Sequence, residues 1–482
     1  MRGGGFRFPN RFEPWLAGMA ATLVTAMLSW RPSFWFDEAA TVAAADRSEI
    51  DLLRLLLNFD AVHGLYYLVM HMWLSWVPIN EFTVRLPSAV AVGIAAAGLM
   101  VLTKLVADRP TAWAAAVAFT VLPRTLWAAV EARSSALTAA MAVWLTVVCV
   151  LAAARGGAVL WSLYAFVLAL AVLSFVYLGL LVFAHALTVA ASWPRRRLVP
   201  FVAAVTAGLI LASPLVAVAA SQRHQISWID TISGGATATA LWEQWFTHSR
   251  LFLCVSIVVL GWGTVILVLR HGRGHAAALG VALPWVVVPT VLLIGYSVIF
   301  RNIYQPRYLT YTTPGLGLLL GVCVVAIARD QTRYVVFLLG VLALSASTAF
   351  VGQRNLEGKP GGADYFVAAE LIATHAHPRD CVIFGSAPRE PLRAIATTRP
   401  AAFALLDDVA AGVSGPEAAQ LWSQDLPWDS DVVRPRLANC AVLWVIVDQQ
   451  PDPPLVSAAR HQRFSVDQRW VLHRTVVLRL SR

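Results

Sequence analysis

Long runs of apolar residues, separated by short polar loops, fill the chain up to about position 351. A helix of roughly 20 mostly apolar residues is long enough to cross a bilayer, and about eleven runs approach that length. We therefore predict about eleven transmembrane helices. They cover residues 13–30, 84–107, 111–124, 134–154, 158–174, 176–193, 198–219, 250–270, 276–299, 308–328 and 333–351. A shorter apolar run at 63–77 predicts a re-entrant or juxtamembrane helix.

Basic residues recur in every second loop between these runs. The clusters are Arg2 with Arg7 and Arg11, Lys104 with Arg109, Arg155, Arg195–Arg197, Arg270 with Arg273, and Arg329 with Arg333. Because short cytoplasmic loops are enriched in lysine and arginine, this pattern predicts an N-terminus inside and a C-terminus outside. The first run has no small-residue cleavage site before Trp30, so we expect a retained span rather than a signal peptide.

The pattern changes at about residue 352, where glycine, proline and charged residues become frequent and no spanning run follows. We predict a transmembrane domain over 1–351 and an extracytoplasmic soluble domain over 352–482. Apolar bursts at 381–384 and 442–447 are typical of buried strands. Helical patterns alternate with them, which favours an α/β domain with a partly parallel sheet. These patterns cover residues 363–376, 416–423 and 454–462.

Composition supports a polytopic membrane protein. Hydrophobic residues make up 58% of the chain and charged residues 13%, and the mean hydropathy is +0.66, so lipid must solvate most of the chain. The net charge of +10 raises the question of a nucleic-acid partner. Much of the basic excess lies in the orienting loops and the C-terminal domain, so we expect no such partner.

The five cysteines fall into two groups. Cys149, Cys254 and Cys323 lie within predicted spans, where they act as packing residues. Cys381 and Cys440 lie in the outer domain, and each precedes a predicted strand. An oxidising exterior permits a disulfide between them, but the pairing depends on a geometry that spacing does not supply. The sequence therefore leaves open whether Cys381 and Cys440 form a disulfide or are free thiols.

An acidic pair, Asp37-Glu38, follows the first predicted span and is surrounded by aromatic residues. The predicted orientation places the pair outside. Carboxylates held beside a membrane are costly, which marks them as candidate functional residues.

Further polar residues gather in the same outer loops. Residues 50–57 form an amphipathic stretch, which we interpret as an interfacial helix in preference to a direct substrate contact. Asp60 follows it, and His63, Tyr67 and His71 then recur every four residues, a spacing that would place them on one helix face. That face could line a cavity. For His71 we favour a buried, hydrogen-bonded histidine.

Two later loops carry arginines. Arg133 follows Glu131 at the outer end of a predicted span, where it could bind a phosphate, pair with Glu131 or reach the lipid interface. Arg307 and Tyr308 stand with Arg301 and Tyr304 at the start of another span. An aromatic belt accounts for the tyrosines but not for the two arginines, which suit an anionic lipid.

Together these residues fit transfer of a glycosyl group from a lipid phosphate to a hydroxyl. A carboxylate would act as general base towards the acceptor. The arginines would stabilise the negative charge that grows on the departing phosphate.

Several short motifs resemble the GT-C superfamily of polyprenyl-phosphate-sugar-dependent glycosyltransferases. They include an Asp-Glu pair, a His-containing segment ending in Tyr-Tyr, and an Arg-Leu-Pro-Ser element, in the order of the protein O-mannosyltransferase and aminoarabinose transferase branch. The matching segments are residues 35–39, 58–67, 84–88 and 131–137, with Pro306-Arg307-Tyr308 and Pro314. Val62 and Gly64 flank the histidine where the family often has prolines after it, and Ser135 replaces a tyrosine.

The resemblance implies a role for each matching position. Asp37 would be the catalytic base, and Glu38 would position the acceptor or tune that base. The donor phosphate would bind Arg133 and Arg307 with Tyr308, and His63 would lie near the reaction centre. With Asp60, Tyr67 and Glu131 as further substrate-binding candidates, these are the predicted site residues.

The resemblance also implies an inverting enzyme with a polyprenyl-phosphate sugar as donor and a glycolipid, glycan or protein as acceptor. Mannose or a pentose such as arabinofuranose is the expected sugar. No metal-ligating cluster stands out: His375, His377 and Asp380 are more typical of a polar turn, and a need for a divalent ion stays open. The main alternative is a lipid or solute transporter, but transporters usually carry ionisable groups near the midplane within repeated halves.

Overall fold

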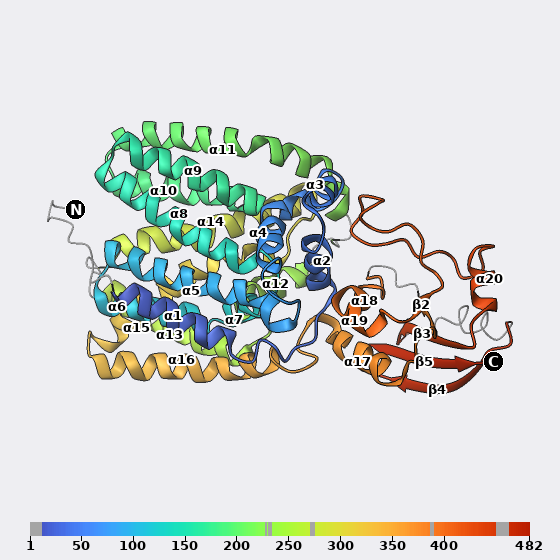
Figure 1. Ribbon diagram of the computed structural model, residues 1–482. Coiled ribbons are helices and arrows are strands. Elements are labelled where there is room, and N and C mark those ends of the chain that lie inside the picture. Colours follow the sequence, from blue (N-terminus) through green and yellow to red (C-terminus); the bar gives the residue numbers. More distant parts are fainter. Residues whose placement is uncertain (1–11, 227–228, 230–233, 270–274, 386–389, 450–461) are drawn as a thin grey trace. The chain divides into compact units, whose positions relative to one another are not determined.

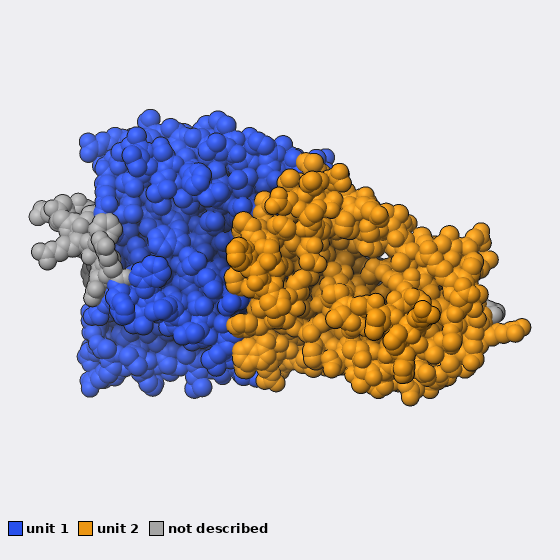
Figure 2. Space-filling view, viewed as in Figure 1, with its two compact units in different colours: residues 1–27, 62–66, 85–353 blue, residues 28–61, 67–84, 354–482 orange. Residues whose placement is uncertain are grey.

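The computed structural model describes residues 12–226, 229, 234–269, 275–385, 390–449 and 462–482 (Figure 1). The chain forms two compact units, each built from separate stretches of sequence (Figure 2). The first comprises residues 1–27, 62–66 and 85–353, and the second comprises 28–61, 67–84 and 354–482. The second unit therefore combines two early segments with the whole C-terminal part.

The first unit is helical. Its α-helices are α1 (Phe12–Ala26), α6 (Arg109–Val121), α7 (Pro123–Ala129), α8 (Ser135–Arg155), α9 (Ala158–Ser174), α10 (Leu181–Ser192), α11 (Leu198–Ser221), α12 (Gly234–Phe246), α13 (Arg250–Leu269), α14 (Ala276–Ile299), α15 (Thr313–Ala328) and α16 (Thr332–Gly352). Short 3₁₀ segments are η2 (Val176–Leu180), η3 (Arg195–Arg197), η4 (Arg223–Ile226) and η5 (Pro306–Thr312). Helix α5 (Glu81–Val106) begins in the second unit and continues into the first.

Each predicted apolar run contains a helix. Within the described ranges, seven helices are long and apolar enough to cross a membrane, or eight if the α6–α7 pair, bent by 64°, is one span. Helices α1, α9 and α10 are shorter than a full span. The protein is therefore a mostly helical, multi-pass membrane protein, and the count of about eleven spans stays a prediction.

Helix α15 is the most buried of these seven helices, and small residues explain how tightly it packs. A Cβ atom at Gly317 would lie 2.7 Å from Cβ of Phe119 on α6, and one at Gly321 would lie 2.5 Å from the backbone nitrogen of Ala115. Glycines four residues apart let two membrane helices approach closely, and packing then replaces the hydrophobic effect as the source of stability. Helices α15 and α6 therefore pack closely against each other within the first unit.

The second unit contains helices and a sheet. Its helices are α2 (Phe36–Ala45), α3 (Glu49–Asn58), η6 (Pro360–Gly362), α17 (Tyr365–His375), α18 (Ala394–Thr398), α19 (Pro400–Phe403) and α20 (Val433–Ala438). Segment η1 (Ala61–His63) and helix α4 (Gly64–Leu74) each have residues assigned to both units. The strands are β1 (Cys381–Phe384), β2 (Asp407–Asp408), β3 (Val442–Asp448), β4 (Ser465–Val471) and β5 (Thr475–Ser481).

The five strands form one sheet in the order β2-β1-β3-β5-β4. Strand β1 pairs in parallel with β2 and β3, whereas β5 pairs antiparallel with β3 and β4. The predicted strands at 381–384 and 442–447, the helix at 363–376 and the partly parallel sheet are confirmed. The β4–β5 hairpin was not predicted, because the edge strand β4 is exposed and mostly polar and so carries no apolar run.

The helix predicted over 416–423 is wrong. This segment lies in a loop whose ends pair through backbone hydrogen bonds, from Gly412 N to Gln424 O at 2.9 Å and from Leu426 N to Ala410 O at 2.8 Å. Those contacts between distant backbone groups overrode the local helical pattern. The helix predicted over 454–462 lies outside the described residues, apart from its last position.

Cys381 and Cys440 form a disulfide, with their Cα atoms 5.9 Å apart. The bond joins the first residue of β1 to a residue two positions before β3, and these two strands are neighbours in the sheet. Cys149 and Cys323 are buried within helices of the first unit, as packing residues would be, whereas Cys254 is exposed on α13.

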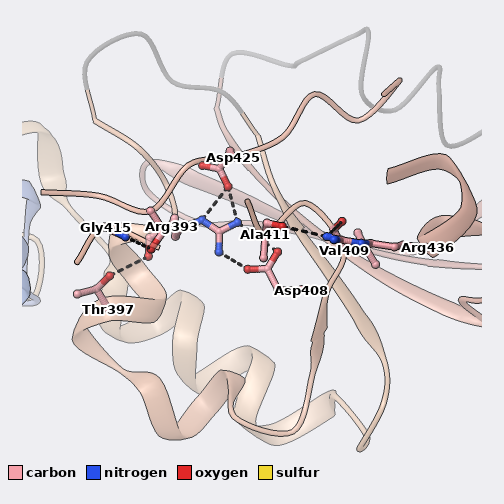
Figure 3. Close-up of polar contacts among 9 residues, drawn as sticks. Arg393, Thr397, Asp408, Val409, Ala411, Gly415, Asp425 and Arg436 are labelled. Atoms are coloured by element: carbon pink, nitrogen blue, oxygen red, sulfur yellow. Dashed lines mark hydrogen bonds and ion pairs between the residues drawn. The ribbon is translucent and has the colours of Figure 1, made fainter. Parts of the chain in front are cut away.

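An arginine clamp organises the loop between β2 and α20 (Figure 3). Arg393 donates to Asp425 Oδ1 at 2.7 Å through Nε and to Asp408 Oδ1 at 3.2 Å through Nη2. Its guanidinium also lies 5.0 Å from the ring centre of Phe384 on β1. The clamp therefore connects the loop to the first strand of the sheet.

Candidate functional site

The acidic pair occupies the first turn of α2. Trp35 is the extended N-cap residue, so Asp37 and Glu38 are the second and third residues of the helix. Carboxylates near a helix N-terminus are stabilised by the unpaired N–H groups and the helix dipole. Asp37 is 8% exposed and Glu38 is 0% exposed. The local sequence thus holds two carboxylates in a nearly dry environment.

Residues from the C-terminal part of the second unit lie beside this turn. Lys359 Nζ lies 3.2 Å from Glu38 Oε1, and both side chains are buried. Tyr365 begins α17, and burial, followed by nearby carboxylates that include Asp37, raises the pKa of its hydroxyl above the ordinary value. Tyr365 therefore stays protonated and can donate a hydrogen bond at neutral pH.

Asp60 and Tyr67 are brought together. The Tyr67 hydroxyl donates a 2.8 Å hydrogen bond to Asp60 Oδ2. Asp60 has a φ of 56°, a left-handed conformation that aspartate tolerates better than most residues. Helix α4 begins at Gly64, so Tyr67 and His71 lie on it and His63 precedes it. His71 Nδ1 lies 2.9 Å from the Ala45 carbonyl oxygen, so this histidine is hydrogen-bonded as expected, but it is half-buried rather than buried.

The first unit contains a second polar group, centred on Arg124. This buried side chain donates to the carbonyl oxygens of Gln244 at 3.1 Å and Glu243 at 2.7 Å. It also interacts electrostatically with Glu131 and Arg307. Two of the predicted site residues, Glu131 and Arg307, therefore share one charged neighbourhood.

Aromatic rings form a cluster in the same unit. The ring of His63 stacks on Phe175 at 6.2 Å, and Phe175 meets Tyr308 edge-on at 5.5 Å. Tyr308 in turn stacks on Tyr177 at 5.5 Å. The chain thus gathers His63 and Tyr308, which are far apart in sequence, around Phe175. Such flat faces can bind a sugar ring or an isoprenoid chain.

Two of the motifs that carry the family resemblance are in direct contact. The Ser88 hydroxyl, in the Arg-Leu-Pro-Ser element, donates a 2.6 Å hydrogen bond to the carbonyl oxygen of Glu131. Arg85 of the same element is 0% exposed. Arg133 lies half-buried in the turn between α7 and α8.

The predicted site residues divide between the units. Asp37, Glu38, Asp60 and Tyr67 belong to the second unit, and the others belong to the first. Sequence reasoning assigned no role to Lys359, Arg85, Arg124, Phe175 or Tyr177. Tyr177 lies within the predicted span 176–193, and Phe175 is the single residue between that span and the preceding one. Only the rarity of lysine in this chain could have drawn attention to Lys359.

Among the described residues, no group of three or more His, Cys, Asp or Glu side chains is arranged to hold a metal ion. Asp380 Oδ2 instead accepts from the backbone N–H of His377 at 3.0 Å and from Trp444 Nε1 at 3.0 Å. His375 Nδ1 lies 3.0 Å from the carbonyl oxygen of Leu371. These contacts describe a polar turn, the preferred interpretation of this segment.

Comparison with solved structures identifies the architecture. The apo form of ArnT from Cupriavidus metallidurans superposes with a TM-score of 0.58 at 13% identity, and the match covers 96% of this chain and 97% of ArnT. Its form bound to undecaprenyl phosphate gives 0.54 at 14% identity over the same shares. The chain has a GT-C-type membrane fold. No protein-family model and no curated protein matches the sequence.

Two other structures with the GT-C-type fold extend the comparison. The mycobacterial arabinofuranosyltransferase AftD gives a TM-score of 0.55 at 19% identity, and the match covers 98% of this chain but 40% of AftD. The oligosaccharyltransferase from Archaeoglobus fulgidus gives 0.50 at 12% identity, over 90% of this chain and 68% of the other. The likeness to ArnT therefore spans both proteins almost completely, whereas AftD extends far beyond the shared part.

Proposed function

We propose that this protein is a membrane glycosyltransferase that moves a sugar from a polyprenyl-phosphate donor to an acceptor hydroxyl on the outer face of the cytoplasmic membrane. The observation that carries the proposal is the buried Asp37-Glu38 pair in the first turn of α2, in a chain with a GT-C-type fold. The ArnT structure that contains undecaprenyl phosphate supports a polyprenyl-phosphate carrier.

The proposed reaction makes one bond and breaks one bond at the anomeric carbon of the sugar, and it transfers one proton from the acceptor hydroxyl. The Asp37 carboxylate accepts the proton of the acceptor hydroxyl, and the acceptor oxygen attacks the anomeric carbon from the face opposite the phosphate. The bond between that carbon and the phosphate oxygen breaks, and its electron pair leaves with the polyprenyl phosphate. The products are an inverted glycoside, a polyprenyl phosphate and a proton on Asp37 that later passes to water.

Arginines of the first unit would bind the donor phosphate. Arg307 and Arg133 are the proposed ligands, with Tyr308 beside them. Arginine suits this role because its planar guanidinium can form paired hydrogen bonds to phosphate and stays charged. Stabilisation of the charge on the leaving phosphate would lower the barrier to transfer.

Aromatic and polar residues would bind the sugar and the acceptor. The His63, Phe175 and Tyr308 rings offer faces for a sugar or a lipid chain, and Asp60, Tyr67 and Glu131 complete the proposed substrate contacts. Mannose and a pentose are the proposed sugars, and the name of AftD supports arabinofuranose among them. The acceptor would be a glycolipid, a glycan or a protein.

The test is a transfer assay with purified protein in lipid nanodiscs. Radiolabelled polyprenyl-phosphate mannose, arabinofuranose and aminoarabinose are offered with glycolipid, glycan and peptide acceptors. The proposal requires transfer from at least one donor, and it requires Asp37→Asn to abolish transfer while donor binding is retained. A fully active Asp37→Asn variant would refute the role of Asp37, and a folded wild-type protein that transfers none of these sugars would refute the proposed function.

A further inference from the structure

Glu38 and Lys359 form an ion pair that is removed from water. The two atoms are 3.2 Å apart, and the side chains are 0% and 1% exposed. The residues are 321 positions apart in sequence. Because charges in such a place are costly to bury, removal of either side chain would take a close counter-charge away from the other and destabilise the local structure.

Lysine is rare in this chain, so its presence opposite Glu38 points to a specific requirement at that position. Only two of the 37 basic residues are lysines, Lys104 and Lys359. Lys104 pairs with Glu13 of α1, at one end of the first unit. A lysine ammonium is a compact point charge on a flexible stem, so it can reach a single buried carboxylate where the planar guanidinium of arginine requires more room and more acceptors.

Two other contacts hold α2 to the C-terminal part of the same unit. The ring of Phe36, the first residue of α2, lies 5.4 Å from that of Trp422. Beyond the other end of the helix, Arg47 donates to the carbonyl oxygens of Gln420 at 2.5 Å and Leu421 at 2.8 Å. These carbonyls are available because the segment is not helical. Helix α2 is thus fastened at both ends by residues from 354–482.

We infer that Lys359 is a positioning residue for the proposed reaction, acting through Glu38 to hold the first turn of α2 and its neighbouring base Asp37 in place. The inference rests on the proposed function. In this inference the C-terminal part of the chain helps to position α2, the helix that carries the proposed base, in addition to any role in acceptor binding.

Charge balance gives the reason for a large effect. With the ion pair intact, the Glu38 carboxylate, which is adjacent to Asp37 in the first turn of α2, has a close positive charge 3.2 Å away. Without Lys359 that close positive charge is lost, and the turn would shift as the Glu38 carboxylate moves towards water. A displacement of about 1 Å in a catalytic group can cost about 100-fold in rate.

The test is a charge cycle in the full-length protein, with a donor that the wild type uses. Lys359→Met should lower kcat by about 10- to 100-fold and leave the KM for the donor nearly unchanged, because the donor phosphate binds elsewhere. Lys359→Arg restores the positive charge but not the compact shape of lysine, so it should recover only part of the lost kcat. The double variant Glu38→Gln/Lys359→Met should have a higher kcat than either single variant, Lys359→Met or Glu38→Gln, because each single variant keeps one buried charge and removes its close counter-charge.

Arg399→Met is the matched control. Arg399 pairs with Glu81 at 2.5 Å in the same unit, but neither residue belongs to α2. This variant should keep the wild-type kcat. A Lys359→Met variant with wild-type kcat would overturn the inference, as would an equal loss in Arg399→Met or a double variant no more active than Glu38→Gln. The comparison of the double variant with Glu38→Gln can be made even if Lys359→Met fails to fold.

The outcomes separate this inference from the proposed function. If the wild type transfers no sugar, the proposed function fails. If the wild type is active and Asp37→Asn is inactive, but the charge cycle shows no coupling between positions 38 and 359, only the role of Lys359 fails.

Discussion

The Tyr67 hydroxyl donates its hydrogen bond to Asp60, seven residues earlier, and so ties the start of α4 to the turn that follows α3. Asp60 has left-handed backbone geometry there, and the carboxylate it offers Tyr67 keeps the turn in place. Both residues were predicted to contact substrate. The bond gives them a structural role that can be measured separately from catalysis.

Tyr67→Phe should therefore lower the free energy of unfolding by about 1–2 kcal/mol, the value of a hydrogen bond to a charged group at a partly buried site. Thermal unfolding of the detergent-solubilised protein measures the change. Tyr334→Phe, at a tyrosine that is 46% exposed, is the control and should have no effect. A Tyr67→Phe variant with unchanged stability but a raised substrate KM would favour substrate contact instead.

Arg307→Ala should mainly weaken use of the donor. Loss of one charge-assisted hydrogen bond to phosphate costs about 1.5–3 kcal/mol, which corresponds to a rise of about 10- to 100-fold in the KM for the polyprenyl-phosphate sugar. Steady-state transfer kinetics at varied donor concentration give this value. Arg333→Ala, which removes an arginine at the start of α16, serves as control. An unchanged KM would show that Arg307 is a structural arginine.

Reduction of the Cys381–Cys440 disulfide should destabilise the second unit. The bond closes a long loop, with a sequence separation of 59 residues, and a native disulfide of this kind contributes about 2–4 kcal/mol. Cys381→Ser/Cys440→Ser should therefore lower Tm, and a reducing agent should lower the Tm of the wild type but not of this variant. Cys254→Ser should behave like the wild type, since Cys254 is a free, exposed thiol.

Loss of the Arg393 clamp should loosen the loop that begins after Asp408 of β2 and contains Asp425. Arg393→Met leaves two carboxylates without their shared cation, and because both are partly exposed we expect a loss of about 1–3 kcal/mol, less than for a fully buried pair. Proteolysis within the loop and the Tm report the change. Arg434→Met removes an exposed pair with Asp431 at 3.8 Å and should be neutral. If proteolysis and Tm changed equally in the two variants, the stabilising role of the Arg393 clamp would be contradicted.

Gly321→Ala should disturb the packing of α15 on α6. The added methyl group would meet the backbone of Ala115 at 2.5 Å, and overpacking of this kind costs about 1–3 kcal/mol. Gly340→Ala places the same group on α16, with nothing within 4 Å, and is the matched control. Thermal stability in detergent should fall only in the first variant. Equal stability of the two variants would mean that the helices can separate without cost.

The amino-acid sequence by itself determined most helices of the first unit, although not α7 or α12, and two inner strands of the sheet, β1 and β3. Lipid and buried strands both require continuous apolar residues, so hydropathy is a local signal that a linear reading can follow. The acidic pair and the arginines were conspicuous for a related reason, since charges are rare in such a chain.

Only the tertiary structure decided which of these residues meet. Glu38 and Lys359, His63 and Phe175, and Arg124 and Arg307 are each far apart in sequence, and no period in the chain relates them. The loop at 412–424 is irregular although its sequence favours a helix, because its end residues pair with each other and Arg47 binds its carbonyls. Hydropathy is a property of each residue and can be read from the sequence. The partner of a buried charge depends on which distant segments the fold brings together, so it requires the tertiary structure.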